Sequence, residues 1–195
     1  MKTNMLQFIL VAFLSVILIS CNNQGSNNSE NDNSDSIEMN ENATGDGMME
    51  GNQNDDQDFM EEAAYGGLME VELGRYAQQA AQNPRVKNFA AMMVKDHSKA
   101  NDELKALAAK KNIVLPTTLD DKHMDKINDL KEKKGAEFDK NYMKEMVDDH
   151  EKDVDKFKKH AENGNDSDIK AFAAKTLPVL LMHQDSAKRI HEMLK

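Results

Sequence analysis

Four ionisable side chains stand at the centres of otherwise apolar helical stripes: Glu70, His97, His150 and His183. Apolar residues that recur every three and four positions form the face that a helix buries, so these side chains are expected inside a core. A buried carboxylate costs several kcal/mol unless it is paired, and a buried imidazole without a hydrogen-bond partner is penalised as well. The four groups are therefore expected to satisfy one another, either directly or through a shared ion.

Two kinds of chemistry fit this set of side chains. Histidine is a frequent ligand of transition metals, and three imidazoles with one carboxylate suit a single Zn, Mn, Fe or Cu ion. A metal-free network of glutamate–histidine hydrogen bonds, which would fix the register of the helices, satisfies the same groups. The first interpretation predicts a metal site, and the second predicts a structural polar layer. A third alternative is that the helix register is misjudged, in which case the four side chains do not meet.

Four neighbours of the histidines are candidates for a supporting role. Asp96 and Asp149 each precede a histidine by one residue, about 100° around the helix, and are expected to orient ligands or to join helices. Met93 and Met146 lie one turn before the histidines and would suit copper, although methionine more often fills irregular gaps in a core. The other histidines are assigned no role: His123, His160 and His191.

A 53-residue repeat places two of the histidines in the same local context. Residues 93–99 (MVKDHSK) return as residues 146–152 (MVDDHEK), with His97 in the first copy and His150 in the second. Both copies lie in long helical patterns, so the two histidines are expected in matching places on two helices.

The elements that must position these residues are helices. No segment shows the sustained alternation of a strand, and glycine and proline stand mostly where helices should stop. The pattern predicts helices at 58–82, 84–111, 119–133, 136–162 and 166–193. Asn83 is expected to cap the second of them, with Pro84 in its first turn.

Short turns predict two antiparallel hairpins, one at each end of the domain. Residues equidistant from a turn lie side by side, which pairs Glu70 with His97 and His150 with His183. The short connecting helix lets the helices that carry His97 and His150 run parallel, and this brings both pairs to one height. The predicted fold is all-α, a four-helix bundle with an extra short helix in its long connection.

Residues 1–20 have the layout of a lipoprotein signal peptide. Their apolar run at 8–19 is shorter than the ~20 residues that a membrane span requires, and it follows Lys2. The sequence LISC at 18–21 resembles a bacterial lipobox, so Cys21 is expected to carry a lipid at the mature N-terminus. An ordinary signal peptide followed by a chance cysteine is the alternative. Cys21 is the single cysteine, which excludes an internal disulfide and a thiolate metal site.

Residues 21–57 are expected to form a disordered acidic tether rich in Asn and Ser. Residues 22–58 hold ten of the 35 acids and none of the 25 Lys and Arg, so the domain at 58–195 is close to neutral. Such a tether reaches on the order of 35 Å. The expected partner is the membrane, through the lipid on Cys21. The absence of a basic face and of Trp argues against nucleic acid, and a protein partner is left open.

Several motifs that follow one another along the domain resemble one bacterial family. They are GLMEVELG at 67–74, MVKDHSKA at 93–100, GAEFD at 135–139, MVDDH at 146–150, and LP at 177–178 before His183. Together they cover about residues 58–194 and resemble the outer membrane protein family known as domain of unknown function 4142. The resemblance implies a ferritin-like four-helix bundle, export to the cell envelope and no defined activity.

One departure from ferritin-like proteins restricts the chemistry. Their di-iron sites use Glu-x-x-His on two helices, whereas Val94, Val147 and Leu180 stand three residues before the histidines here. Ferroxidase or oxygenase activity therefore does not follow from the fold. A mononuclear metal enzyme is a third interpretation. No nucleophile motif, phosphate loop or cofactor fingerprint is present, so such an enzyme would first need a metal with an open coordination position. The leading expectation is a lipid-anchored protein of the outer membrane, facing the periplasm or the cell surface, that binds one metal ion.

Overall fold

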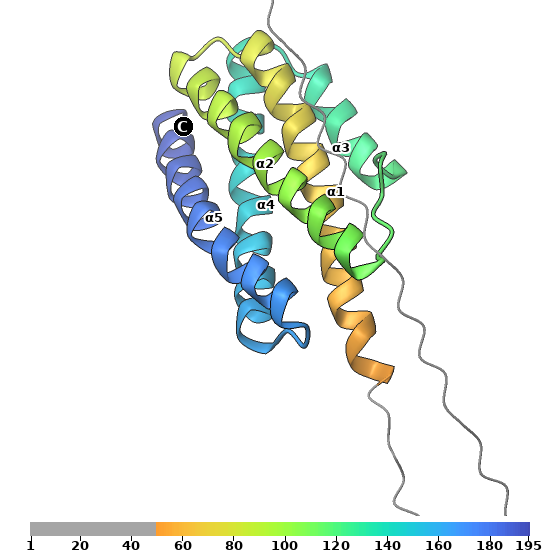
Figure 1. Ribbon diagram of the computed structural model, residues 1–195. Coiled ribbons are helices and arrows are strands. Elements are labelled where there is room, and N and C mark those ends of the chain that lie inside the picture. Colours follow the sequence, from red (N-terminus) through yellow and green to blue (C-terminus); the bar gives the residue numbers. More distant parts are fainter. Residues whose placement is uncertain (1–49) are drawn as a thin grey trace, which may run out of the picture. The chain divides into compact units, whose positions relative to one another are not determined.

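The computed structural model describes residues 50–195, and their side chains from Asp55 onward. The expected signal peptide, Cys21 and most of the expected tether lie outside the described residues. The described part contains five helices and no strand (Figure 1): α1 Glu50–Ala80, α2 Pro84–Lys111, α3 Asp121–Glu132, α4 Gly135–Asn163 and α5 Ser167–Met193. The all-α prediction is confirmed. None of these five helices combines the length and the apolar character of a membrane span.

The start of α1 differs from the sequence prediction. The helix begins at Glu50, eight residues before the expected start at 58. The acidic, glycine-containing stretch before Asp58 has the composition of a tether, but it gains tertiary partners. Asp56 is only 5% exposed and its carboxylate lies 2.7 Å from His160 Nε2, while Phe59 stacks on the same imidazole with ring centroids 3.9 Å apart. The other four helices begin and end within two residues of their predicted bounds.

The predicted cap of α2 is present. The Asn83 side chain accepts a hydrogen bond from the Arg85 backbone N–H at 2.9 Å, and Pro84 occupies the first turn. Only three residues separate the end of α1 at Ala80 from the start of α2 at Pro84, so the turn of the first hairpin is short.

The two hairpins, α1–α2 and α4–α5, lie side by side with α2 and α4 running parallel (Figure 1). The end of α2 meets the start of α5, where Lys111 Nζ lies 2.5 Å from Asp166 and 2.8 Å from Asp168. α3 lies across α1 and α4 and carries the chain back to the end at which α4 starts. This arrangement agrees with the prediction that His97, His150 and His183 lie at one height along the bundle.

An aspartate of each hairpin closes the turn of the other hairpin. Asp139 of α4 is 2% exposed and accepts hydrogen bonds from the backbone N–H groups of Gln82, at 3.0 Å, and Asn83, at 2.7 Å. Asp56 of α1 accepts from the backbone N–H groups of Asn165, at 3.2 Å, and Asp166, at 2.7 Å. The backbone donors of each turn are thus satisfied by a side chain from a distant part of the chain.

The core consists of two apolar clusters with a polar layer between them. The cluster near the α1–α2 turn includes Leu73, Phe89, Met93, Phe138, Tyr142 and Met146. The cluster near the α4–α5 turn includes Phe59, Met60, Leu104, Phe157, Phe172 and Leu180. The polar layer is made by Glu70, His97, His150 and His183, each of which is 6% exposed or less.

Candidate metal centre

The three histidines of the polar layer meet in the interior, one from each of α2, α4 and α5. The ring centroids lie 5.6 Å apart for His97 and His150, 5.2 Å for His97 and His183, and 5.4 Å for His150 and His183. One nitrogen of each ring lies within 4.8 Å of one nitrogen of the other two rings. The helix register predicted from the turns therefore brings the three imidazoles together.

The other nitrogen of each ring is held by an acceptor. Nδ1 of His97 lies 2.8 Å from Oε2 of Glu70. Nδ1 of His150 lies 2.9 Å from the backbone carbonyl oxygen of Met146. Nε2 of His183 lies 3.1 Å from Oδ2 of Asp96. These contacts fix the orientation of all three rings.

The acceptors also decide which nitrogen carries hydrogen. A carbonyl oxygen only accepts, and a carboxylate only accepts in its ionised form, in which the nitrogen that faces each of them is the N–H donor. The lone pair of a neutral imidazole then lies on the other nitrogen, which is Nε2 in His97 and His150 and Nδ1 in His183. His150 Nε2 lies 3.4 Å from His183 Nδ1, and His97 Nε2 is buried without a hydrogen-bond partner.

The electrostatics of the site keep the imidazoles neutral. Burial disfavours the charged form and lowers the pKa of His97, His150 and His183 to about 4, while nearby carboxylates oppose this shift only in part. At neutral pH the three rings are unprotonated. Three lone pairs therefore face one another in a buried space.

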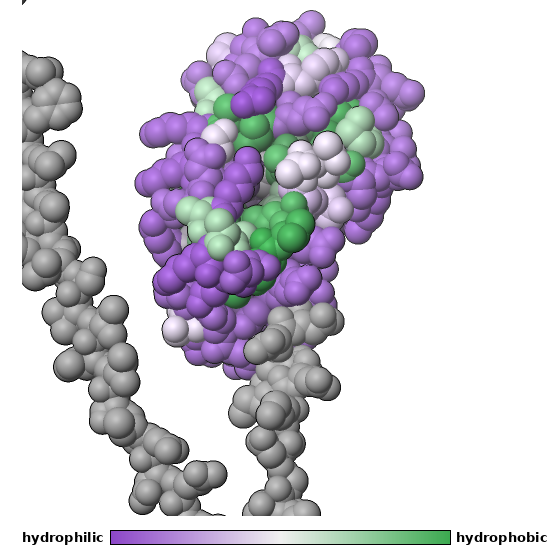
Figure 2. All heavy atoms as spheres, turned by 45° about the vertical axis from the view of Figure 1, so that its right-hand side comes forward, coloured by the Kyte–Doolittle hydropathy of each residue, from purple (hydrophilic) through white to green (hydrophobic). Residues whose placement is uncertain are grey.

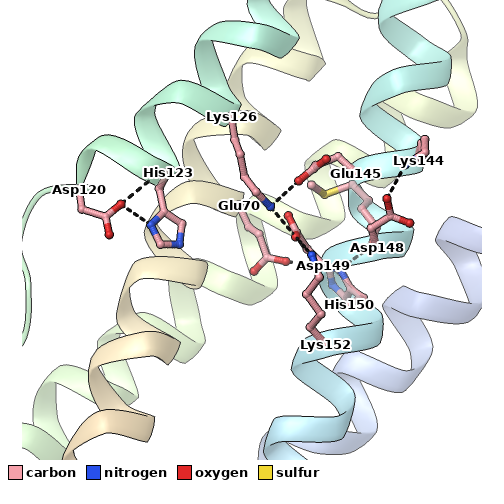
Figure 3. A network of polar contacts seen from close by, with 11 residues as sticks. Glu70, Asp120, His123, Lys126, Lys144, Glu145, Asp148, Asp149, His150 and Lys152 are labelled. Carbon is pink, nitrogen blue, oxygen red and sulfur yellow. Dashed lines mark hydrogen bonds and ion pairs between the residues drawn. The ribbon is translucent and has the colours of Figure 1, made fainter.

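Glu70 lies beside the imidazoles and not among the three converging nitrogens. Its Oε2 contacts Nδ1 of His97, and its Oε1 lies 3.4 Å from Nδ1 of His150 (Figure 3). Burial raises the pKa of Glu70 to about 7; Asp149 adds to the shift, while His150 opposes it. The sequence places this carboxylate at the right height, but it contacts the nitrogens that face away from the centre.

The two expected aspartates take supporting parts, and the two methionines pack in the core. Asp96 orients His183, as proposed for a supporting residue. Asp149 joins two helices, since it pairs with Lys126 of α3 at 2.8 Å; it also contacts Lys152 at 3.4 Å (Figure 3). The side chains of Met93 and Met146 belong to the apolar cluster near the α1–α2 turn, which favours the core-filling interpretation.

Sequence reasoning missed a cleft of about 550 Å³ between α1, α3 and α4, which has Glu70 among its lining residues. His123 of α3 stands in this cleft, stacked on Tyr65 with centroids 5.3 Å apart, and its Nδ1 lies 2.5 Å from Asp120 (Figure 3). Asp153 also lines it; burial, with help from Glu70, raises the pKa of Asp153 to about 7. Asp153 stands three residues after His150, a spacing that puts both on one face of α4 and could have indicated it. No pattern in the sequence indicates that α3 lies over the cleft.

A protein-family model described as "Domain of unknown function (DUF4142)" matches residues 41–190. The chain belongs to the DUF4142 family. The match includes the whole polar layer and confirms the family resemblance drawn from the motifs. No curated protein and no solved structure matches the chain. The DUF4142 description assigns no activity.

Proposed function

We propose that this DUF4142 protein binds a single transition-metal ion through His97, His150 and His183. The observation that carries the proposal is the convergence of three imidazole lone pairs in one buried space, where they repel one another unless a cation lies between them. With Zn–N bonds of about 2.0–2.1 Å, ligand nitrogens lie about 3.3 Å apart. His150 Nε2 and His183 Nδ1 are 3.4 Å apart, so this pair needs almost no movement.

Glu70, Asp96 and the Met146 carbonyl would then act on the ion through the imidazoles that they orient. Such acceptors fix the tautomer of a ligating histidine and increase its basicity. An imidazole-rich set suits Zn, Fe, Cu or Mn, and three protein ligands leave a coordination position for water or a small ligand. The protein would buffer, carry or sense the metal, and no catalytic residue is assigned.

Elemental analysis of the untagged protein tests this function. The protein is stripped with a chelator, reconstituted with metal and desalted. One equivalent per chain is expected, falling to near zero in a His97→Ala/His150→Ala double variant. His191→Ala, a change of the same residue type two turns beyond His183, is the matched control and should retain the metal. Equal, near-zero metal in the unaltered protein and the double variant would rule the proposal out.

A metal-free hydrogen-bond network is the second candidate. It is favoured by the acceptors that hold the outer nitrogens, and one proton shared between His150 and His183 would make their 3.4 Å contact a hydrogen bond. In that case the layer serves only to fix the helix register. A chelator would leave the melting temperature of the protein as isolated unchanged, whereas loss of a bound metal would lower it.

We also infer that the chain is an exported lipoprotein of the outer membrane with a ferritin-like four-helix bundle. The inference is supported by LISC at 18–21 and by two hairpins joined through α3. Mass spectrometry of the mature N-terminus should find a lipid on Cys21. Cys21→Ser should move the protein from the membrane fraction to the soluble one, and an unlipidated N-terminus at another residue would contradict the anchor.

A further inference from the structure

The cleft between α1, α3 and α4 shares lining residues with a cavity beside His97. This second, smaller cavity of about 20 Å³ is lined by His97. Two carboxylates, those of Glu70 and Asp153, line both the open cleft and the cavity beside His97.

The charge of the cleft favours a cation. Seven carboxylate residues and four lysines line it, and an excess of one sign in a concave site concentrates ions of the opposite sign. Lys126 reaches from α3 to Glu145 at 2.5 Å and to Asp149 at 2.8 Å, where it offsets part of the negative charge (Figure 3).

Two buried carboxylate oxygens along the cleft have no hydrogen-bond partner. They are Oε1 of Glu70, whose residue is 1% exposed, and Oδ2 of Asp149, whose residue is 7% exposed. A buried acceptor without a donor is costly, and a cation that passes along the cleft would relieve that cost.

A glycine leaves the α1 wall of the cleft open. At Gly66, an added Cβ would lie 3.8 Å from Oδ2 of Asp153, which is ordinary van der Waals contact. A methyl group therefore fits, but a larger side chain would fill the space beside Asp153.

We propose that this cleft is the entry path of a divalent metal ion to the three imidazoles, with Asp153 and then Glu70 as oxygen ligands along the way. The inference rests on the metal site proposed above and adds the route and the residues that serve it. Asp153 acts here on the rate of binding, because it is not among the residues that hold the ion at the end.

Stopped-flow uptake of Co²⁺ by the metal-free full-length protein, followed through the visible absorption of bound cobalt, tests the path. Asp153→Asn is expected to slow uptake about tenfold, within the range of electrostatic steering, with an unchanged final spectrum and Kd. Gly66→Leu should slow uptake without any change of charge. Lys126→Gln should speed it. Asp155→Asn, an exposed aspartate on the same helix, is the matched control and should leave the rate unaltered.

The outcomes separate this inference from the function on which it rests. Uptake rates for Asp153→Asn equal to those of Asp155→Asn, with normal cobalt binding, would overturn the path and leave the metal site standing. A weaker Kd with an unchanged association rate would make Asp153 a support of the bound ion, and it would also overturn the path. If the unaltered protein gives no cobalt spectrum, both proposals fail. Melting curves of each variant confirm that slow uptake is measured on folded protein.

Discussion

Each histidine of the polar layer has one nitrogen bound to an acceptor and the other turned inward. The acceptors differ in kind: Glu70 holds His97, a backbone carbonyl holds His150, and Asp96 holds His183. A carboxylate raises the basicity of its imidazole more than a carbonyl does, because it carries charge. His97 and His183 should therefore be the stronger ligands, and His150 the one most firmly fixed in its tautomer.

Glu70→Gln is expected to weaken metal affinity about 10–100-fold, the range typical of residues that orient ligating histidines. The amide keeps an oxygen acceptor for His97 but loses the negative charge that balances a bound cation. Competition with a chromophoric chelator measures the change in Kd. Glu72→Gln is the control, since Glu72 lies on the outer side of α1 against Lys131. Equal affinity in the two variants would show that Glu70 has no part in binding.

At the scale of elements, the hairpins hold each other through the aspartates that close their turns. Asp139→Ala removes the buried carboxylate that accepts from the backbone N–H groups of Gln82 and Asn83. We expect a loss of about 2–3 kcal/mol in the free energy of unfolding, measured by urea denaturation of the metal-free protein. Glu137→Ala, which removes only an exposed ion pair with Lys133, should change it by less than about 1 kcal/mol. Equal effects would contradict this role for Asp139.

The contact between the end of α2 and the start of α5 should depend on pH. Hydrogen bonds from Lys111 and Lys110 lower the pKa of Asp168 from 3.8 to about 2. The folded state thus favours the ionised carboxylate, and its contribution is present above about pH 4 and is lost as the pH falls toward 2. Asp168→Asn should lower the melting temperature by about 1–3 °C at pH 7 and leave it unchanged near pH 2.

Thermal scans of the metal-free protein across this pH range give the answer for Asp168. Asp185→Asn provides the control, because Asp185 pairs with Arg189 within α5 and joins no second helix. A difference that persists at pH 2 would assign the effect of Asp168→Asn to helix propensity and not to the ion pair.

Sequence patterns predicted the helices and the level of the polar layer because both follow from local rules. Asn83 and Pro84 fixed a turn, and counting outward from it paired Glu70 with His97. The apolar spacing and the repeat then placed His150 at the same height.

Other parts of the site depend on packing that no periodicity encodes. A register gives the height of Glu70 but not which ring nitrogen its carboxylate meets. The helical start at Glu50 depends on partners more than 100 residues away, at Asn165 and Asp166. His123 enters the cleft only because α3 folds across α1 and α4, so its sequence neighbours give no indication of a site.

At the scale of the whole molecule, the polar layer divides the apolar core, so a bound ion would join its two halves. A ligand that binds only the folded state stabilises it by about 2.7 kcal/mol at a free concentration of 100 times Kd. We therefore expect saturating metal to raise the melting temperature by about 5–10 °C. The His97→Ala/His150→Ala variant should show no rise, and an equal rise in both proteins would place the bound metal elsewhere.

The outer surface is mostly hydrophilic, with apolar areas confined to small patches on the face in view (Figure 2). Three apolar side chains near the middle of α5 are exposed, with exposed fractions of 36% for Val179, 45% for Leu181 and 46% for Met182. Exposed apolar side chains are common on the surface of a folded domain. The side chains of the proposed metal site lie instead in the interior.

The reciprocal closure of the turns has a consequence for synthesis. Asp56 is synthesised 110 residues before Asp166, the residue whose backbone N–H it accepts from. The backbone N–H groups of Gln82 and Asn83 likewise have no acceptor until Asp139 has been synthesised. A nascent chain that has released only α1 and α2 therefore carries an incomplete hairpin. Its final structure can form only once translation has reached the opposite half.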